Sequence, residues 1–410
     1  MIRNSAVVGA GTMGRGIAMC FANAGIPVRL KDEKREALDS AMRAIQMLYE
    51  HSVQKGRVPA EEAQSRLSRI RPQIDYSGFE TAEVIVEAAF ENLEVKRTVF
   101  AELGPLAKSG AILATNTSYL NVDEIAERCS RAENVIGLHF FNPANVMRLV
   151  EVVPGKATAE HITAAALALT EKLGKVAVIA GNCPGFIGNR MLRVYRREAQ
   201  LLLEEGASPR QVDSALEEWG MAMGPFAVQD LVGIDIAMSS RHVFAPLEQP
   251  GCRKPRVIEM LYTQGRLGKK TDAGWYRYDA GSKQVDPAVD DLIEQVAHEA
   301  DTNRRSISSE EIIERTIYAL INEGARILEE GHASSAADID LVYAHGYGFP
   351  SSRGGPMKYA DTVGLGVVYR RVLEFRAVHG ANWEPSSLLA RLAEAGGSFS
   401  DFDHARGKAG

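Results

Sequence analysis

The sequence predicts a doubly wound α/β sheet followed by two tandem all-α modules related by internal duplication. Three observations support this fold class. A glycine-rich turn joins an apolar strand to an apolar helix near the start of the chain, apolar strands then alternate with helices, and the remaining helical part repeats itself. With 410 residues the chain is long enough for two or three domains, each with a core of its own.

Residues 5–32 contain, in order, a strand, a glycine-rich turn, a helix, a second strand and an acidic residue. Gly9 permits the tight turn, Gly11 lets backbone N–H groups approach a pyrophosphate, and Gly14 lets the helix pack closely on the strand. The N-terminus of the helix favours the negative charge of a phosphate. We therefore predict a Rossmann-type domain whose turn contacts a dinucleotide through Gly9, Gly11, Thr12, Met13 and Gly14. A glycine-rich turn that binds no ligand is the weaker alternative.

The acid at the end of the second strand predicts which dinucleotide binds. Asp32 is placed to accept hydrogen bonds from the hydroxyl groups of the adenosine ribose. The 2′-phosphate of NADP would meet this carboxylate, so we expect NAD to be the cofactor.

Composition argues against several other classes of protein. The net charge is −6 without a long basic or acidic run, so we expect neither nucleic acid nor a membrane as partner. The four cysteines form no C-x-x-C pair, which indicates reduced thiols, and no cluster of metal ligands is apparent. No apolar run is long enough to span a bilayer, and Met1 leads almost at once into a strand. A cytoplasmic enzyme without a targeting segment is the expectation.

After Asp32 the alternation of strands and helices pauses. Residues 34–54 and 59–69 predict two antiparallel helices, which form a hairpin inserted at about residues 34–69. Lys55 ends the first of these helices, and from the pattern alone a solvated helix face is the simpler interpretation of its charge.

Regular alternation resumes beyond the hairpin. Strands are predicted at 84–88, 111–114, 135–138, 149–153 and 176–179, with helices at 93–106, 122–128 and 159–173. Strands this rich in Val, Ile and Leu predict a sheet that is covered on both faces. Ligands of such sheets bind beyond the carboxyl ends of the strands. Polar side chains that follow these ends are expected to form one site: Glu91, Asn116, Ser118, His139 and Asn142.

From Cys183 onward the pattern is helical. Helices are predicted over 186–205, from Ser208-Pro209 and from Gly224-Pro225, before an irregular aromatic segment at 268–278, a linker at 279–287 and an acidic helix. Ser308 and Glu311 form a capping box that opens a further helix. We predict an NAD-binding domain at 1–182, a first helical module at 183–280, a linker with a helix at 281–307, and a second, degenerate helical module at 308–410.

The two helical modules share sequence features in the same order. Residues 203–206 (LEEG) recur at 328–331, and the same offset aligns Asn189 with Glu314. It also aligns Arg190 with Arg315 and Glu198 with Glu323. A polar residue suited to a site therefore exists only in the first copy. We expect the second copy to pack against the first as a subunit does in a symmetric dimer, which would allow the chain to act as a monomer.

His139 and Glu151 predict an acid–base pair, because each lies in a strand and the two strands are joined by a reverse connection. A carboxylate bound to a histidine holds one tautomer and stabilises the imidazolium ion. This suits removal of a hydroxyl proton while hydride leaves the same carbon for a nicotinamide. Ser118 and Asn189 are candidates to hold the substrate oxygen. The simpler alternatives are a structural histidine and an asparagine that only caps its helix.

Six segments of the chain are distinctive: NTSYL (116–120), GLHFFNPANVMRLVEVV (137–153), GNCPGFIGNRML (181–192), MGPFAVQDLVGID (223–235), GRLGKKTDAGWYRY (265–278) and YGFPSSRGGPMKYAD (347–361). These segments resemble the L-3-hydroxyacyl-CoA dehydrogenases of fatty-acid β-oxidation. The duplicated module resembles the dehydrogenase half of bacterial and peroxisomal multifunctional enzymes, in which a hydratase/isomerase domain precedes the nucleotide domain. A subunit that works with a separate enoyl-CoA hydratase is therefore one possibility.

The resemblance implies a reaction and a set of residue roles. It implies NAD-dependent oxidation of L-3-hydroxyacyl-CoA to 3-ketoacyl-CoA, with His139 as base, Glu151 as its partner, and Ser118 and Asn189 on the substrate oxygen. The implied cofactor contacts are Asp32, Ala89, Glu91, Lys96, Ser118, Asn142 and Lys270, and Lys55 would bind the coenzyme A phosphate. The alternatives are a 3-hydroxy acid without coenzyme A as substrate, and a non-catalytic NAD-binding module.

The chain departs from the family pattern at positions that shape the substrate pocket. It has Tyr119 and Ala144 within segments that otherwise match the family pattern, and it has Gly188 where many members have valine. The second module has VYAHGYGFP, two residues longer than bacterial relatives, so either Tyr343 or Tyr347 is expected to face the substrate. These departures leave the length of the acyl chain open.

Overall fold

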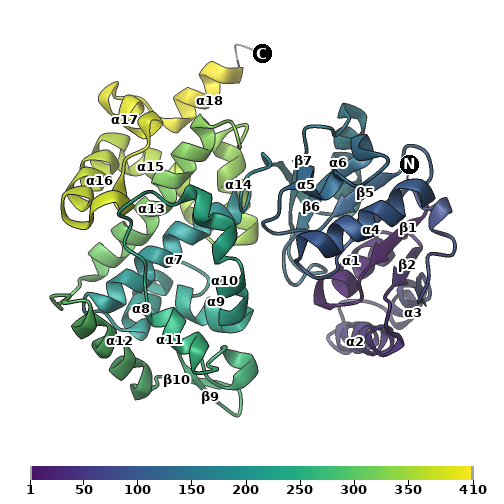
Figure 1. The fold of residues 1–410 in the computed structure, drawn as a ribbon, viewed down its shortest axis with the longest axis horizontal. Helices are drawn as coiled ribbons and strands as arrows, with labels where there is room; N and C mark the ends of the chain where they lie inside the picture. Colours follow the sequence, from purple (N-terminus) through teal and green to yellow (C-terminus); the bar gives the residue numbers. More distant parts are fainter. Residues whose placement is uncertain (1, 408–410) are drawn as a thin grey trace. The chain divides into compact units, whose positions relative to one another are not determined.

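The structure is a computed structural model that describes residues 2–407. The chain divides into two compact units, residues 1–186 and 187–410, drawn from purple to blue and from teal to yellow in Figure 1. The sequence placed this boundary after residue 182.

The first unit contains an eight-stranded sheet in the order β3-β2-β1-β4-β5-β6-β7-β8. The strands are β1 (Ser5–Val8), β2 (Val28–Lys31), β3 (Ile70–Gln73), β4 (Val84–Glu87), β5 (Ile112–Thr115), β6 (Val135–Phe140), β7 (Leu149–Pro154) and β8 (Val176–Ile179). Neighbouring strands are parallel except β6 and β7, which are antiparallel. The predicted doubly wound sheet is thereby confirmed, and β4, β5 and β6 end at the same edge.

Helices cover both faces of this sheet. Side chains of α1 (Thr12–Asn23), α2 (Arg35–Gln54), α3 (Ala60–Ser68) and α6 (Glu160–Lys172) share one apolar core with alternate strand residues such as Ile136 and Leu138. α5 (Val122–Ala126) lies over the other face, where Val122 approaches Gly137, and it contacts α4 (Leu93–Leu106). Because side chains alternate along a strand, His139 belongs to this second face.

Strand β3 was not predicted. Its residues Ile70-Arg71-Pro72-Gln73 pair only with β2, at the edge of the sheet. An edge strand tolerates proline and polar side chains because one side of its backbone needs no partner. Such a segment has no run of apolar residues and therefore gives no strand signal.

The second unit is helical except for one small hairpin among its described residues. Its helices are α7 (Gly188–Glu204), α8 (Pro209–Trp219), α9 (Pro225–Val232), α10 (Ile234–Ser239), α11 (Val257–Thr263), α12 (Pro287–Glu299), α13 (Ser309–Glu329), α14 (Ala336–Gly346), α15 (Pro356–Val363), α16 (Leu365–His379), α17 (Ser387–Glu394) and α18 (Phe399–Gly407). The predicted linker at 279–287 is in part a strand, because β10 (Ser282–Gln284) pairs with β9 (Arg277–Asp279). These strands are short and mostly exposed, so no apolar pattern marks them.

Ion pairs between α7 and α13 follow the internal duplication. Each helix carries a buried arginine that binds two glutamates. One glutamate lies within the other helix, and the second is the residue that follows that helix. The pairs are Arg190 with Glu323 (2.7 Å) and Glu330 (2.6 Å), and Arg315 with Glu198 (3.0 Å) and Glu205 (2.5 Å). Aligned residues thus exchange partners, as across the two-fold axis of a symmetric dimer. The second copy packs against the first in the way that the repeat predicted.

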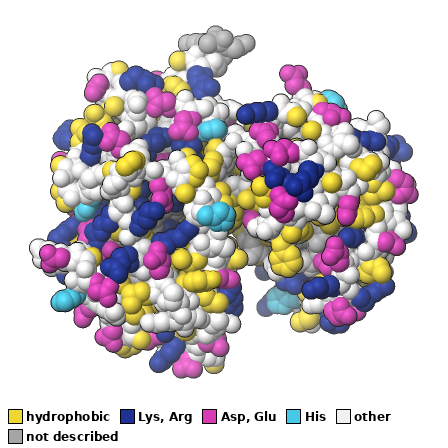
Figure 2. Space-filling view, viewed as in Figure 1, with side chains coloured by type: hydrophobic (Ala, Val, Ile, Leu, Met, Phe, Trp, Pro, Cys, Tyr) yellow, Lys and Arg dark blue, Asp and Glu magenta, His cyan; other side chains and the backbone are white. Residues whose placement is uncertain are grey.

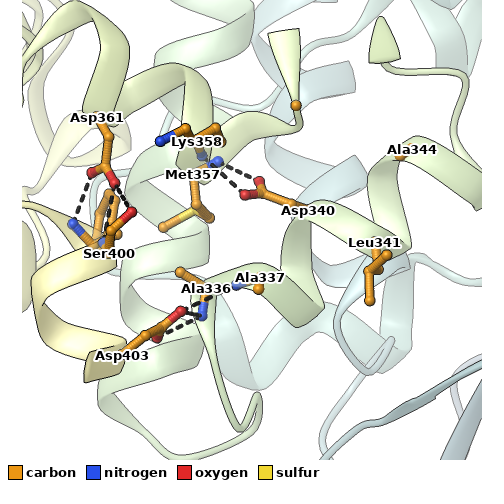
Figure 3. A pocket seen from close by; sticks show the side chains of 12 residues that line it. Ala336, Ala337, Asp340, Leu341, Ala344, Met357, Lys358, Asp361, Ser400 and Asp403 are labelled. Atoms are coloured by element: carbon orange, nitrogen blue, oxygen red, sulfur yellow. Dashed lines mark hydrogen bonds between the residues drawn. The ribbon is translucent and has the colours of Figure 1, made fainter. Parts of the chain in front are cut away.

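Three aspartates of the second module cap helices in a closed cycle beside a cavity of about 380 Å³, as Figure 3 shows. Asp340 of α14 caps α15, Asp361 of α15 caps α18, and Asp403 of α18 caps α14. The donors are the backbone N–H groups of Met357 and Lys358, of Phe399 and Ser400, and of Ala336 and Ala337. Each carboxylate satisfies helix N–H groups that have no partner within their own helix.

Charges of both signs are interspersed on the face drawn in Figure 2, and no single-sign region dominates it. No helix within residues 2–407 has the length and hydropathy needed to cross a membrane.

Candidate active site

The glycine-rich turn between β1 and α1 has two tightly packed glycines and one that faces open space. Gly9 has φ +99°, and a Cβ there would lie 2.6 Å from the carbonyl oxygen of Ala88. A Cβ on Gly14 would lie 1.8 Å from the carbonyl oxygen of Gly9. By contrast, a Cβ on Gly11 would meet no atom within 4 Å. Gly9 and Gly14 are therefore required by the packing, while Gly11 leaves the room that a phosphate needs.

The N-terminus of α1 is suited to an anion. No side chain caps it, and its first turn contains no acidic residue. Asp32 lies just beyond β2, where its Oδ2 accepts a hydrogen bond from the N–H of Ala10 (2.8 Å). This hydrogen bond holds the Asp32 carboxylate next to the glycine-rich turn. A group bound by the carboxylate would therefore lie close to a phosphate bound at the turn. An uncapped helix end, an open glycine and an acid just beyond β2 fit a dinucleotide of the NAD type.

Lys96 is enclosed by carboxylates at the ends of the central strands. Its side chain is fully buried, and its Nζ lies 2.9 and 3.0 Å from the two carboxylate oxygens of Glu87 and 3.3 Å from Oε2 of Glu91. Burial opposes the charge of Lys96, but Glu87 and Glu91 outweigh it and raise the pKa of the amine. An ammonium group has three protons, and these contacts account for all of them.

Glu91 in turn holds the loop that carries Ser118. Its Oε1 accepts hydrogen bonds from the hydroxyl of Thr117 (2.5 Å) and from the backbone N–H of Ser118 (2.8 Å). In the same loop, Oδ1 of Asn116 accepts from the N–H of Phe140 in β6 (2.9 Å). The ends of β4, β5 and β6 are thus joined by side chains, as the prediction of a common site requires.

His139 and Glu151 are directly opposite each other on the antiparallel strands β6 and β7. The Nδ1 of His139 lies 2.7 Å from Oε2 of Glu151, and the carboxylate is fully buried. The imidazole ring packs against Phe141, with centroids 4.4 Å apart, and Phe186, at 5.9 Å. This apolar surrounding strengthens the hydrogen bond between the pair. The contact that the sequence predicted is present, whereas its role in catalysis stays a prediction.

The remaining predicted residues lie elsewhere in the two units. In the first unit, Asn142 is exposed just past β6, and Lys55 is exposed at the end of α2. In the second unit, Lys270 binds Asp235 (2.5 Å), and Asn189 lies in the first turn of α7. The backbone N–H of Ala89 donates to Glu87 (2.7 Å).

One residue and one contact near these groups were missed by the sequence reasoning. Glu87 is a fully buried acid that ends an apolar strand and also accepts a hydrogen bond from the hydroxyl of Thr115. An acid at the end of such a strand, with a lysine in the next helix, is the signal that would have found it. Tyr347 donates to Asn189 from the second helical module, and no local pattern marks this contact.

One group of potential metal ligands occurs among the described residues, in the second unit. Atoms of Glu205, Glu311 and His379 lie within 4.8 Å of one another. The guanidinium of Arg315 lies 2.5 Å from Glu205 and 3.9 Å from Glu311. A positive charge therefore already occupies the position that a cation would take.

Comparison with known proteins extends this picture. A family model described as the NAD-binding domain of 3-hydroxyacyl-CoA dehydrogenase matches residues 4–183. The model of the C-terminal domain of the same family matches twice, at residues 185–278 and 312–399. The chain belongs to the 3-hydroxyacyl-CoA dehydrogenase family. As a member of this family of oxidoreductases it binds NAD through the first unit, and its second unit contains two copies of the family's C-terminal domain.

Individual relatives agree with this assignment. The chain is 41% identical over 406 residues to the human peroxisomal bifunctional enzyme, which covers 95% of this chain and 56% of the relative. It is 38% identical over 406 residues to the fatty acid oxidation complex subunit alpha of Psychrobacter cryohalolentis, with coverage of 97% and 56%. The chain thus spans about half the length of these curated relatives. The crystal structure of 3-hydroxybutyryl-CoA dehydrogenase from Escherichia coli matches with a TM-score of 0.84 at 29% identity, covering 98% of this chain and all of that one.

Proposed function

We propose that this chain oxidises the 3-hydroxyl group of L-3-hydroxyacyl-CoA thioesters to the 3-ketone, reversibly and with NAD. The single observation that carries the proposal is the buried pair of His139 and Glu151, 2.7 Å apart, at the edge of an NAD-binding sheet in a member of this family. Folding alone does not require a buried polar pair at this place, because apolar residues of similar volume are often at least as stabilising.

His139 is the proposed general base. Glu151 accepts a hydrogen bond from Nδ1–H, which leaves Nε2 as the atom that takes the hydroxyl proton. Bound NAD would supply the acceptor for the hydride that leaves the same carbon. The Glu151 carboxylate stabilises the imidazolium ion that forms, and in the reverse direction this ion returns its proton to the ketone oxygen.

Ser118 and Asn189 are the proposed ligands of the reacting oxygen. The backbone of Ser118 is held by Glu91, and the carboxamide oxygen of Asn189 accepts from Tyr347. Both groups are therefore restrained before substrate binds, which lowers the cost of organising the site.

The proposed cofactor contacts are those of the glycine-rich turn with Asp32, Ala89, Glu91, Ser118, Asn142 and Lys270. We place Lys96 behind them, because its three protons are already used by Glu87 and Glu91. It would then act on the cofactor through Glu91. The exposed ammonium of Lys55 is the proposed contact of the coenzyme A phosphate.

Partners and location are extensions of the same proposal. The chain would act as a monomer, because its second module already occupies the face of α7 that a partner subunit would cover. The names of the relatives, a bifunctional enzyme and a subunit of a fatty acid oxidation complex, support association with an enoyl-CoA hydratase. A cytoplasmic location stays a prediction, since peroxisomal and bacterial proteins both occur among the relatives.

The test is the loss of NADH absorbance when acetoacetyl-CoA, and then longer 3-ketoacyl-CoA thioesters, are added. We expect rapid loss with NADH and little with NADPH, because Asp32 disfavours a 2′-phosphate. Free 3-keto acids are the matched control, because they test whether the substrate must carry coenzyme A. Activity on the free acids alone would favour a substrate without coenzyme A. Silence on every compound, with NADH still bound, would favour a non-catalytic module.

Replacement of the proposed base separates chemistry from binding. His139→Ala should lower turnover by about two to four orders of magnitude and leave NADH affinity, measured by fluorescence, nearly unchanged. Near-normal turnover of this variant would refute the assignment of the base.

A further inference from the structure

The second helical module contacts a residue that only the first module has. Tyr347 follows α14, and its hydroxyl lies 3.1 Å from Oδ1 of Asn189 in α7. The ring occupies the space beside the preceding residue. A Cβ on Gly188 would lie 2.4 Å from both Cε2 and the hydroxyl oxygen of Tyr347. A side chain at position 188 would therefore displace the tyrosine.

The position of the Tyr347 ring is set by its own module. Tyr343 stacks on it with ring centroids 4.8 Å apart and an interplanar angle of 21°. The hydroxyl of Tyr343 donates to the carbonyl oxygen of Gly188 (3.3 Å), and the backbone N–H of Tyr347 donates to the carbonyl oxygen of Tyr343 (3.2 Å). The stacked pair thus lies on the first turn of α7, where Tyr343 bonds to the backbone of Gly188 and Tyr347 to the carboxamide of Asn189.

The contact places the oxygen end of the amide toward the tyrosine. A carboxamide has an acceptor oxygen and an NH₂ donor at opposite ends, and rotation by half a turn exchanges them. A hydroxyl that donates to Oδ1 favours the orientation in which Nδ2 points away from the tyrosine. A substrate oxygen that gains negative charge needs a donor, so this orientation is the productive one.

We propose that Tyr347 is a positioning residue, which fixes the carboxamide of Asn189 so that Nδ2 donates to the reacting oxygen of the substrate. This inference rests on the proposed role of Asn189. It gives the degenerate module a part in the reaction beyond packing against α7.

The first test removes only the hydroxyl. Tyr347→Phe keeps the ring over Gly188, and we expect kcat/KM for the thioester to fall about fivefold to tenfold, mainly through kcat, which is the loss expected for one neutral hydrogen bond. The KM for NADH and the melting temperature should not change. Tyr343→Phe is the matched control, since it removes a neighbouring hydroxyl that bonds to Gly188 instead, and it should change kcat/KM less than twofold.

The second test asks whether the effect passes through Asn189. In a double-mutant cycle, Tyr347→Phe should have no further effect in the Asn189→Ala background. An equal loss in both backgrounds, or no loss in the single variant, would overturn the proposal. Gly188→Ala provides an independent check, because it displaces the intact tyrosine and should reproduce the loss in kcat.

The activity of the unmodified chain distinguishes a failure of the proposed function from a failure of the role of Tyr347. If the unmodified chain does not turn over any thioester, the proposed function fails and the role of Tyr347 fails with it. If the chain is active and the cycle is additive, only the role of Tyr347 is overturned.

Discussion

In both helical modules a serine caps the second helix, and an aspartate in that helix caps the third. Ser208 and Asp213 do this in the first module, and Ser335 and Asp340 do it in the second. The next aspartate is also present in each copy, but its hydrogen-bond partners differ between the copies. Asp230 accepts from the backbone of Trp275 and Tyr276 in the aromatic segment, whereas Asp361 caps α18.

The copies differ most clearly at the start of the first helix. Asn189 of α7 is aligned with Glu314 of α13, which binds Arg371 (2.7 Å). The aspartates and arginines that both copies retain fold the module and hold the two copies together. The amide that only one copy has is the group with a proposed role in chemistry. We therefore expect residues retained in both copies to be needed for folding, whereas the proposed catalytic amide is found in one copy.

Breaking the reciprocal ion pairs should have the largest effect, and a similar one in each copy. Arg190→Met and Arg315→Met each remove a buried cationic partner of a buried glutamate, Glu323 or Glu198, which then keeps only its neighbour Arg326 or Arg197. We expect each to lower the free energy of unfolding by about 3–5 kcal/mol, measured by urea denaturation. Arg391→Met, which breaks an exposed pair with Glu329, should cost less than about 1 kcal/mol. A large loss for only one buried arginine would contradict the symmetric arrangement.

The glycines that end the repeated LEEG segments should behave differently. Both have positive φ, but a Cβ on Gly206 would lie 2.0 Å from the carbonyl oxygen of Arg305, whereas a Cβ on Gly331 meets no atom within 4 Å. Gly331→Ala should cost about 1–2 kcal/mol from backbone strain alone. Gly206→Ala should cost more, because the backbone must also move. Equal losses of stability in thermal denaturation would contradict this difference. They would mean that the linker before α13, which contains Arg305, moves freely to make room for the Cβ at position 206.

The capping aspartates should give the copies a different dependence of stability on pH. Burial raises the pKa of Asp340 to about 7 and that of Asp213 to about 6. Because both values lie above that of an unfolded aspartate, the folded protein binds protons more strongly, and stability falls as pH rises from about 4 through these values. The difference between the copies, about one unit, is worth about 1.4 kcal/mol.

Replacement with asparagine tests this dependence. The stability of the unmodified chain relative to Asp340→Asn should decline up to about pH 7, and relative to Asp213→Asn only up to about pH 6. Parallel stability curves for the unmodified chain and both variants, at every pH from 4.5 to 8, would contradict the expected titration.

The sequence best predicted the features whose residues lie close together along the chain. The glycine-rich turn and Asp32 lie within one strand–helix–strand unit, so their arrangement follows from residue order alone. The contact of His139 with Glu151 was predictable because two consecutive strands joined by a reverse connection bring facing residues together. The packing of one copy on the other followed from an alignment of the chain with itself, whereas the exchange of ion-pair partners between Arg190 and Arg315 was not predicted.

Other features were not predicted, and each has a physical reason. Strand β3 has a proline and polar residues that only an edge position tolerates. Glu87 lies in an apolar strand, and its cluster forms only when helix α4 folds over the strand ends. Tyr347 is 158 residues from Asn189, and its contact depends on the packing of one module on the other.

The central claim is that the first copy takes part in the reaction at a position where the second copy does not. The most direct test compares Asn189→Ala with Glu314→Ala in the oxidation of NADH by acetoacetyl-CoA. We predict that Asn189→Ala lowers kcat about 100-fold, as expected for removal of a donor to a charged oxygen, and that Glu314→Ala leaves kcat unchanged. Equal effects of the two substitutions, whether large or absent, would contradict the division of roles between the copies.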